Sequence, residues 1–228
     1  MASAPKQNQT QSGEQPVIMP KSTDSNPNLG SQPPARGFCE APQRLEGILK
    51  TLANARGSNI LIVIKGHPDP DSIASAIAQR HLAAGFDIQS TIVFFDQISH
   101  PENRALVKSL DADLRQYRED MDLSAFDYMS FVDTQTTDLP VHVENKPPVL
   151  TLVDHHKTVS GVEAEFMDVR EDAGATSSIY AEYLEHSAYG LSLGEPAHAR
   201  LATALMHGIR ADTDNLLLAR PIDYRAGA

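Results

Sequence analysis

The chain has 228 residues, of which 41% are hydrophobic and 21% charged, and its 30 Asp and Glu against 19 Lys and Arg give a formal net charge of -11. This length suits one cored domain and is short for two, because domains usually have roughly 100–200 residues. Cys39 is the only cysteine, which excludes an internal disulfide and a cysteine-rich zinc site and indicates a reducing compartment. The acidic balance argues against nonspecific nucleic-acid binding.

The N-terminal segment differs in composition from the rest. Residues 1–42 are rich in Gln, Ser, Asn and Pro, and six of the fifteen prolines precede Gly37. Such a segment buries too little apolar surface to offset its chain entropy, so we predict a disordered tail over 1–42 and a folded domain over 43–228. The longest aliphatic run, 60–64, is far shorter than the roughly 20 apolar residues that cross a bilayer, and no signal peptide is present. We therefore expect no membrane association and a cytoplasmic location.

Strands and helices alternate along the folded part. Leucines and an isoleucine at helical spacing over 45–52 predict a helix that stops at Gly57. The β-branched run 60–64 is typical of a strand buried on both faces. Further predicted elements are a helix at 71–84, a strand near 92–95, strands at 128–132 and 149–153, and helices at about 175–189 and 196–209. This order predicts an α/β fold with a mostly parallel sheet flanked by helices on both faces.

Acidic residues follow the predicted strands, at the edge where open α/β sheets bind ligands. Four segments bring carboxylates or imidazoles to this edge: Asp69 and Asp71, Asp133, Asp154 with His155 and His156, and Asp212. Carboxylates held close together repel one another unless a cation neutralises them. Oxygen ligands with an imidazole suit Mn²⁺, Mg²⁺ or a similar ion. The sequence thus predicts a site for one or two divalent ions, where a metal-activated water can attack a phosphoester.

Each of these residues also has an ordinary structural interpretation. A lone Asp at position 71 would more often be the N-cap of the helix behind it. Asp133 followed by Thr134 is compatible with a turn. Neighbouring side chains on an extended segment point to opposite sides, so at most one of His155 and His156 is expected to ligate a given ion. The argument for a site therefore depends on all the segments together.

The order of the segments resembles the successive motifs of the DHH phosphoesterase superfamily. The matching segments are Pro68-Asp69-Pro70-Asp71, Val132-Asp133-Thr134, Val153-Asp154-His155-His156, Gly174-Ala175-Thr176-Ser177, and Gly208-Ile209 with Asp212-Thr213. The resemblance covers roughly residues 58–225. It implies phosphoester hydrolysis, as in nanoRNases that also act on 3'-phosphoadenosine 5'-phosphate, or phosphoanhydride hydrolysis, as in exopolyphosphatases and family II pyrophosphatases.

The resemblance also implies the metal ligands. Asp69 would belong to one metal site and Asp71 to a second, with Asp133 bridging the two sites. His155 and Asp212 would complete the second site. The implied cofactor is Mn²⁺, with Mg²⁺ or Co²⁺ as alternatives, as one or two ions.

The remaining motif residues would act on the substrate or on the ligands. The resemblance places Asp154 behind the ligands and His156 against the substrate phosphate, as the catalytic pair. Thr176 and Ser177 open a helix whose N–H groups could receive an anionic oxygen of the substrate. Helix capping is the alternative interpretation of these two residues.

Two features depart from the family pattern. Lys65 stands where the family has the His that ligates the first metal, and a protonated ammonium cannot ligate. His67 occupies a different position of the same loop. The second site is therefore the better expectation. The family's Gly-rich C-terminal substrate domain also has no counterpart before Ala228, so we expect either a fragment or another mode of substrate selection.

The prediction is a metal-dependent phosphoesterase domain of the Mn²⁺ type that hydrolyses small nucleotides or short oligonucleotides. One alternative is a degenerate, non-catalytic nucleotide- or metal-binding module. The other is a phosphoanhydride hydrolase for pyrophosphate or polyphosphate. The expected partner is a small phosphorylated substrate, and a homodimer is compatible with the sequence, which fixes neither the oligomeric state nor the substrate.

Overall fold

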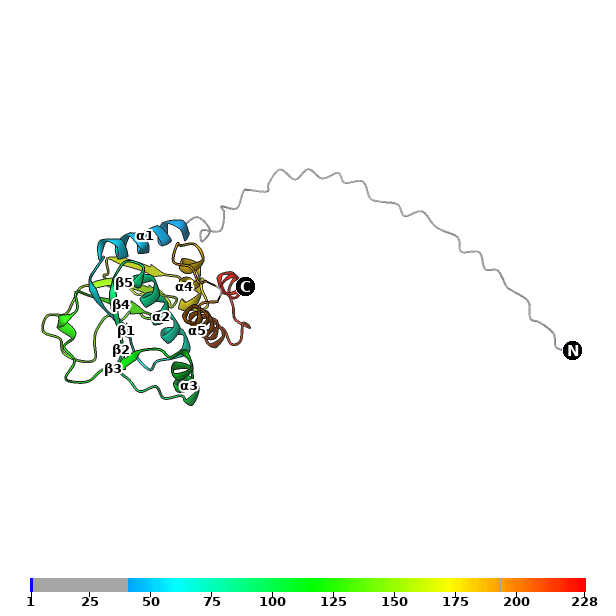
Figure 1. The fold of residues 1–228 in the computed structure, drawn as a ribbon, viewed down its shortest axis with the longest axis horizontal. Coiled ribbons are helices and arrows are strands. Elements are labelled where there is room, and N and C mark those ends of the chain that lie inside the picture. The colour runs from blue at the N-terminus through cyan, green and yellow to red at the C-terminus, as the bar shows by residue number, and fades with distance from the viewer. Residues whose placement is uncertain (2–40, 193) are drawn as a thin grey trace. The chain divides into compact units, whose positions relative to one another are not determined.

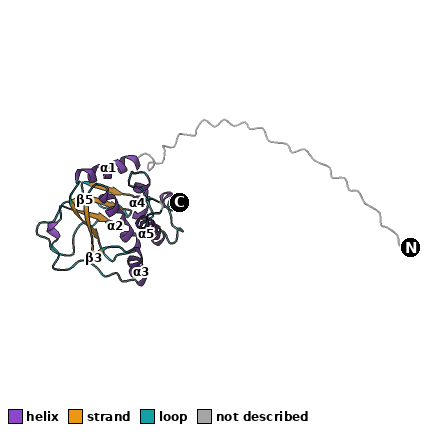
Figure 2. Ribbon diagram, in the orientation of Figure 1, coloured by secondary structure: helices purple, strands orange, loops and turns teal. Residues whose placement is uncertain are grey.

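Six strands form a single parallel sheet in the computed structural model, which describes residues 1, 41–192 and 194–228 (Figures 1 and 2). The sheet order is β3-β2-β1-β4-β5-β6, and every pairing is parallel. The strands are β1 (Asn59–Ile64), β2 (Gln89–Phe94), β3 (Leu114–Gln116), β4 (Tyr128–Val132), β5 (Val149–Asp154) and β6 (Phe166–Val169). The predicted α/β fold with a mostly parallel sheet is confirmed.

The helices are α1 (Ala41–Asn54), α2 (Pro70–Ala84), α3 (Pro101–Leu110), α4 (Thr176–Glu185), α5 (Pro196–Asp212) and α6 (Pro221–Ala226), with a short 3-10 helix η1 (Leu123–Ala125). α1 begins at Ala41, so its first two residues belong to the stretch predicted as tail. The rest of the predicted tail lies outside the described residues. None of the described helices combines the length and the apolar character needed to cross a bilayer.

Alternating side chains of the central strand β1 supply both sides of the core. Ile60, Ile62 and Ile64 belong to the larger of two buried apolar clusters, and Leu61 and Val63 belong to the smaller one. All five side chains are fully buried, and each such burial contributes roughly 1.5–3 kcal/mol. β1 is therefore the rigid support behind the loop that carries Asp69 and Asp71.

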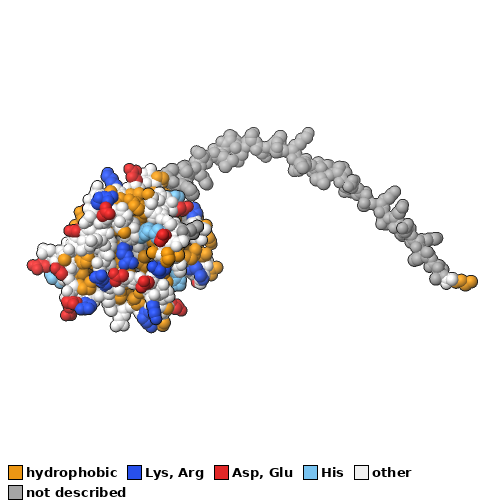
Figure 3. All heavy atoms as spheres, in the orientation of Figure 1, with side chains coloured by type: hydrophobic (Ala, Val, Ile, Leu, Met, Phe, Trp, Pro, Cys, Tyr) orange, Lys and Arg blue, Asp and Glu red, His pale blue; other side chains and the backbone are white. Residues whose placement is uncertain are grey.

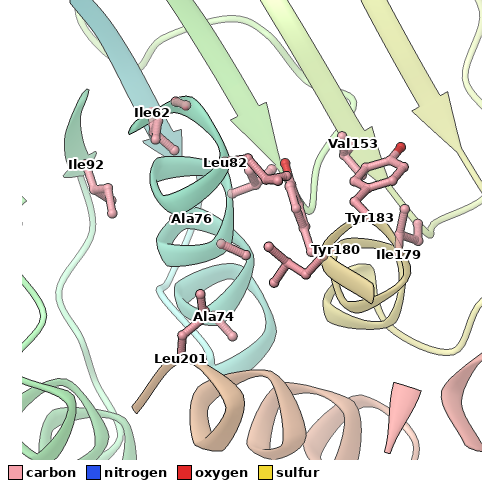
Figure 4. Close-up of a cluster of buried hydrophobic side chains, with 14 of the residues drawn as sticks. Ile62, Ala74, Ala76, Leu82, Ile92, Val153, Ile179, Tyr180, Tyr183 and Leu201 are labelled. Carbon is pink, nitrogen blue, oxygen red and sulfur yellow. The ribbon is translucent and has the colours of Figure 1, made fainter. Parts of the chain in front are cut away.

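The two faces of the sheet are covered differently. Apolar residues of all six α-helices join the larger cluster, in which α2 lies between the sheet and α5 (Figure 4). The smaller cluster is covered by η1 and by side chains of the long connections, such as Tyr117, Leu139 and Val162. Scattered apolar residues of these connections pack down on this face beside η1.

Acidic and basic side chains are interspersed over the viewed face of the molecule (Figure 3). The net charge of -11 is therefore not gathered into one uniform field on that face.

Helix α5 packs very closely against α2 and α4 at Gly208. A Cβ atom at this position would overlap Ser177 Oγ and would lie 3.0 Å from Asp71 Cα. We expect Gly208→Ala to lower the free energy of unfolding by about 1–3 kcal/mol, because the neighbouring backbone must move. Urea unfolding measures this change. Ser177→Ala removes the nearer atom, so the double variant should regain part of the loss, and a fully stable Gly208→Ala protein would contradict the close approach.

Candidate metal centre

The loop after β1 ends in a helix cap. Asp69 is the N-cap of α2: its Oδ1 accepts a hydrogen bond from the Ser72 N–H at 2.8 Å, and its own N–H donates to Ser72 Oγ at 3.1 Å. Pro70 at the first helical position needs no hydrogen-bond partner and favours this start. The cap role that the sequence analysis weighed for Asp71 is therefore filled by Asp69, and Asp71 lies in the first turn of the helix.

The Asp71 carboxylate is held by the start of α4. It is fully buried, and its two oxygens accept the backbone N–H groups of Thr176 and Ser177, each at 2.7 Å. These are free N–H groups of a helix N-terminus, which favours an anion. From the sequence, either a substrate oxygen or simple helix capping was expected at Thr176 and Ser177. In the structure the anion at these N–H groups is the Asp71 carboxylate, and both residues are fully buried.

Asp133 follows β4 in a left-handed conformation, with φ of 57°. Left-handed backbone is uncommon outside glycine, although Asp tolerates it better than most residues. Val132 faces the larger cluster, so an extended residue 133 would face the smaller one. The left-handed turn brings the carboxylate to the opposite side, where its Oδ1 accepts the Thr176 hydroxyl at 3.0 Å. Such local strain is typical of functional sites.

His155 lies among three carboxylates. Its Nε2 is 3.3 Å from Asp212 Oδ2, 3.5 Å from Asp133 Oδ1 and 3.9 Å from Asp71 Oδ2. The atom is buried and makes no hydrogen bond within the described part of the chain. Two groups of side chains have donor atoms close enough to share an ion, namely Asp71, His155 and Asp212, and Asp133, His155 and His156. This nitrogen is buried, lies among carboxylate oxygens and lacks a hydrogen-bond partner in the described part of the chain. Such an arrangement fits a divalent ion with mixed oxygen and nitrogen ligands.

The electrostatics of the cluster favour a cation among its carboxylates. Burial, together with the nearby Asp212, raises the pKa of Asp71 to about 6. Burial and the Asp71 carboxylate hold the pKa of Asp133 well above its usual range. For His155, burial acts to lower the pKa, but Asp212 and Asp71 outweigh it and the net pKa is raised. Protons thus carry the positive charge that a metal ion would supply.

His156 is held differently from its neighbour. Its Nδ1 lies 2.8 Å from Asp154 Oδ1, and its side chain is 58% exposed. Asp154 is fully buried, and its other oxygen accepts the Gln135 side-chain amide at 2.6 Å. The buried carboxylate therefore fixes the imidazole and leaves Nε2 as the free ring nitrogen.

Gln135 is a supporting residue that sequence reasoning missed. Its amide also donates to the Lys157 carbonyl at 3.1 Å, and its Oε1 accepts the Val159 N–H at 2.7 Å. It thereby ties the loop after β5 to the loop after β4. The sequence carries no signal for this role, because a Gln two positions after Asp133 is compatible with any polar connection.

Lys65 and His67 have their neighbours outside the candidate ligands. Ile64 pairs with Val132 in the sheet, so Lys65 and Asp133 follow at the same level of neighbouring strands. Burial lowers the pKa of Lys65, while Asp138 raises it and Lys146 lowers it, so these are its charged neighbours. His67 is exposed, with Nδ1 3.3 Å from the Gln97 carbonyl. His67 belongs to neither of the two ligand groups of the described chain.

The role of Thr176 gives a testable consequence. Its N–H and its hydroxyl bind Asp71 and Asp133, so it fixes the distance between two candidate ligands. We expect Thr176→Val to weaken Mn²⁺ binding by about tenfold, the lower end of the effect of residues that support metal ligands. Titration calorimetry measures the affinity. The matched control is Ser178→Ala, because this buried hydroxyl of the same helix has no hydrogen-bond partner among the described residues. Equal affinities in the two variants would contradict the assignment.

A parallel α/β domain with Asp and His gathered at the carboxyl edge of its sheet defines a class of candidate metal-binding hydrolase domains. Residues 59–209 match the DHH family, N-terminal domain, and the chain belongs to this family. The family is generally dependent on divalent metal ions, and membership supports a phosphoester or phosphoanhydride hydrolase.

Three similar proteins are each longer than the part that matches this chain. An uncharacterized protein of Methanocaldococcus jannaschii is 36% identical over 156 residues, which is 68% of this chain and 30% of that protein. An exopolyphosphatase-related protein from Bacteroides fragilis has a TM-score of 0.60 at 14% identity, over 81% of this chain and 55% of that chain. A putative family II inorganic pyrophosphatase of Methanococcus jannaschii has a TM-score of 0.53 at 20% identity, over 74% and 53%. The chain thus spans less than a third of the curated relative, and the two structural matches show the fold.

Proposed function

We propose that this domain is a divalent-metal-dependent hydrolase that cleaves phosphoester bonds of small nucleotides or short oligonucleotides, with Mn²⁺ as its metal. The observation that carries the proposal is the buried His155 Nε2, which makes no hydrogen bond with the residues that the structure describes and lies 3.3–3.9 Å from three carboxylates. Membership of the DHH family supports the reaction class. The preference for nucleotides comes from the resemblance of the motifs.

The residues divide into holders of the metal and supporters of its ligands. Asp71, Asp133, His155 and Asp212 would hold the ion, as their convergence supports. A bound divalent ion supplies positive charge for the phosphate and activates water at neutral pH. Thr176 fixes two of the carboxylates from the start of α4.

His156 would contact the substrate. Its Nδ1 donates to the buried Asp154, and its largely exposed ring leaves Nε2 toward the substrate, where the protonated imidazole would donate a hydrogen bond to a phosphate oxygen. Asp154 acts through this histidine by fixing its orientation and by stabilising the positive charge of the protonated ring. Because the overall charge is -11, the metal centre and His156 must provide the attraction for an anionic substrate.

Phosphoanhydride hydrolysis is the second candidate function. It is favoured by structural similarity to an exopolyphosphatase-related protein and to a putative inorganic pyrophosphatase. The same site would serve both reactions, because each places a phosphoryl oxygen on the ion. The two candidates differ in the leaving group, which is a nucleoside oxygen in one and a phosphate in the other.

Product release from defined substrates tests the proposal. The chain is incubated with Mn²⁺ and, in turn, with 3'-phosphoadenosine 5'-phosphate, a dinucleotide, pyrophosphate and tripolyphosphate. We expect release of phosphate or mononucleotide from the nucleotide substrates, loss of activity in His155→Gln and full activity in His186→Gln, an exposed histidine at the end of α4. Activity on pyrophosphate or tripolyphosphate alone would favour the second candidate. Equal activity in His155→Gln would refute both.

Lys65 raises the third interpretation, a non-catalytic module. Lys65→His restores the family's residue at this position, and we expect at most a modest change in turnover, because the charged groups that act on Lys65 are Asp138 and Lys146 and none of the candidate ligands. Steady-state kinetics with Mn²⁺ measures the change. A large gain in both bound metal and turnover would support a degenerate site in the natural chain.

A further inference from the structure

A cavity of about 270 Å³ lies at the end of the domain away from the candidate metal centre. It is formed by the last turns of α2, the end of α3 and the first turns of α5. Its lining includes Ile77, Arg80, His81, Leu110, Arg200 and Leu201. The volume is about nine times that of a liquid water molecule, so the cavity has room for a small organic molecule.

Two guanidinium groups line this cavity, in a protein that is otherwise strongly acidic. The Arg80 side chain lines the cavity and donates to the Asp113 carbonyl at 3.0 Å. Arg200 is exposed and has neither an ion pair nor a hydrogen bond to any residue that the structure describes. Asp111 is the carboxylate of the lining, and the nearby Asp113 carboxylate, which also acts on Arg80, pairs with Arg115 at 3.5 Å, so these five groups keep a formal charge of +1. An unpaired guanidinium beside a second one favours an anion.

The rest of the lining is apolar or neutral. Ile77, Leu110 and Leu201 contribute aliphatic surface. His81 donates from Nε2 to the Tyr189 carbonyl at 2.9 Å, and its ring packs edge-on against His198 with centroids 4.9 Å apart. Burial lowers the pKa of His81, so its imidazole is neutral near pH 7 and forms a wall of the cavity. An apolar body can therefore lie beside the anionic group.

We propose that this cavity is a binding site for a small organic anion, whose carboxylate or phosphate lies between Arg80 and Arg200 and whose apolar body lies against Ile77, Leu110 and Leu201. A mostly apolar lining with a few convergent polar groups is the usual character of a small-molecule site. Guanidinium groups match the geometry of carboxylate and phosphate equally well, so the chemistry of the site fits both.

The site is separate from the candidate metal centre. Arg80 is nine residues from Asp71 along α2, and Arg200 is twelve residues from Asp212 along α5, which corresponds to roughly 14 and 18 Å of helix. A ligand in the cavity would thus contact the two helices that carry these two carboxylates. The cavity would still bind its ligand if the metal centre proved to have another function.

The test uses the full chain freed of metal with a chelating resin, so that the acidic metal centre repels anions. Amide NMR spectra are recorded during titration with benzoate and phenylphosphonate, which are ring-bearing anions, and with benzyl alcohol and inorganic phosphate as controls. We expect saturable shifts of Ala84, Ala112 and Ala197, all of which line the cavity, with both ring-bearing anions. Benzyl alcohol lacks the charge and phosphate lacks the apolar body, so both should bind more weakly.

The variants decide whether the arginines hold the anion. Arg200→Gln should weaken binding of the ring-bearing anions by about tenfold or more, because a charge-assisted hydrogen bond is lost. Arg118→Gln removes the same charge at an exposed site paired with Asp120 and should leave binding unchanged. Equal binding to wild type and Arg200→Gln, equal binding of benzyl alcohol, or shifts confined to the metal centre around Gly208 would overturn the proposal.

Discussion

Asp133→Asn is expected to lower metal-dependent hydrolysis by at least about a thousandfold, since a bound metal ion contributes several kcal/mol to transition-state stabilisation. Asp133 Oδ1 accepts the Thr176 hydroxyl and lies 3.5 Å from His155 Nε2, so this carboxylate is at the middle of the cluster. Asparagine keeps the shape and tolerates the left-handed backbone, but it lacks the negative charge that a cation requires. Steady-state kinetics with Mn²⁺ measures the loss of kcat/KM, and calorimetry measures the loss of metal binding.

Asp87→Asn is the matched control for this variant. Asp87 also has a left-handed backbone, with φ of 59°, and its exposed carboxylate forms an ion pair with Arg56. The same chemical change at the same backbone conformation should leave activity at the wild-type level. If Asp133→Asn retained wild-type kcat/KM, the cluster would not be the catalytic metal site.

The sequence predicted the site best where the site residues directly follow a recognisable strand. A buried strand such as β1 is recognisable because its five residues 60–64 are all aliphatic. The carboxyl ends of parallel strands meet at one edge, so the neighbourhood of Asp71, Asp133 and His155 followed from the order of elements alone. The structure brings these three residues and Asp212 together.

The sequence was misleading where a polar residue occupies a buried position. In β6 the one buried residue is Asp168, which accepts hydrogen bonds from Tyr183 and from Arg170 at 2.9 Å. A strand whose inward side chain is a carboxylate lacks the apolar alternation by which strands are recognised. α3 was missed for a related reason, because only Asn103 and Leu110 of its ten residues are buried.

Spacing alone could not predict that Asp69 caps α2 while Asp71 contacts the start of α4. Either residue can cap a helix that begins in this loop, and only the position of Ser72 relative to the helix start decides between them. The tertiary contact of Asp71 with the start of α4 joins residues 105 positions apart. Such a contact depends on packing, which a local pattern does not encode.

Mn²⁺ binding should weaken steeply below about pH 6. The pKa of Asp71 is about 6, and those of Asp133 and His155 are also raised, so a metal ion must displace protons from all three groups at lower pH. The apparent affinity should fall by about tenfold per pH unit for each proton released, and so by up to about a thousandfold between pH 6 and pH 5. Calorimetric titration at a series of pH values measures the slope and, in buffers of different ionisation enthalpy, the protons released.

The same carboxylates should make the stability of the metal-free protein depend on pH. The pKa of Asp71 is raised from 3.8 to about 6, so ionised Asp71 lowers the free energy of unfolding by about 3 kcal/mol. This loss of stability is absent below pH 3.8 and complete above pH 6. Added Mn²⁺ should therefore stabilise the protein against urea more at pH 7 than at pH 5. Equal stabilisation at the two values, or an affinity independent of pH, would mean that these carboxylates do not hold the ion.

The central claim is that one divalent ion is bound through His155 and the three carboxylates around it. Metal analysis after equilibrium dialysis against Mn²⁺, carried out on the wild-type chain and on His155→Gln in parallel, tests this claim most directly. The structure leads us to expect one ion per wild-type chain, because both possible ligand groups share His155, and little or none in the variant. A wild-type chain that binds no Mn²⁺, or a His155→Gln chain that binds as much as the wild type, would contradict it.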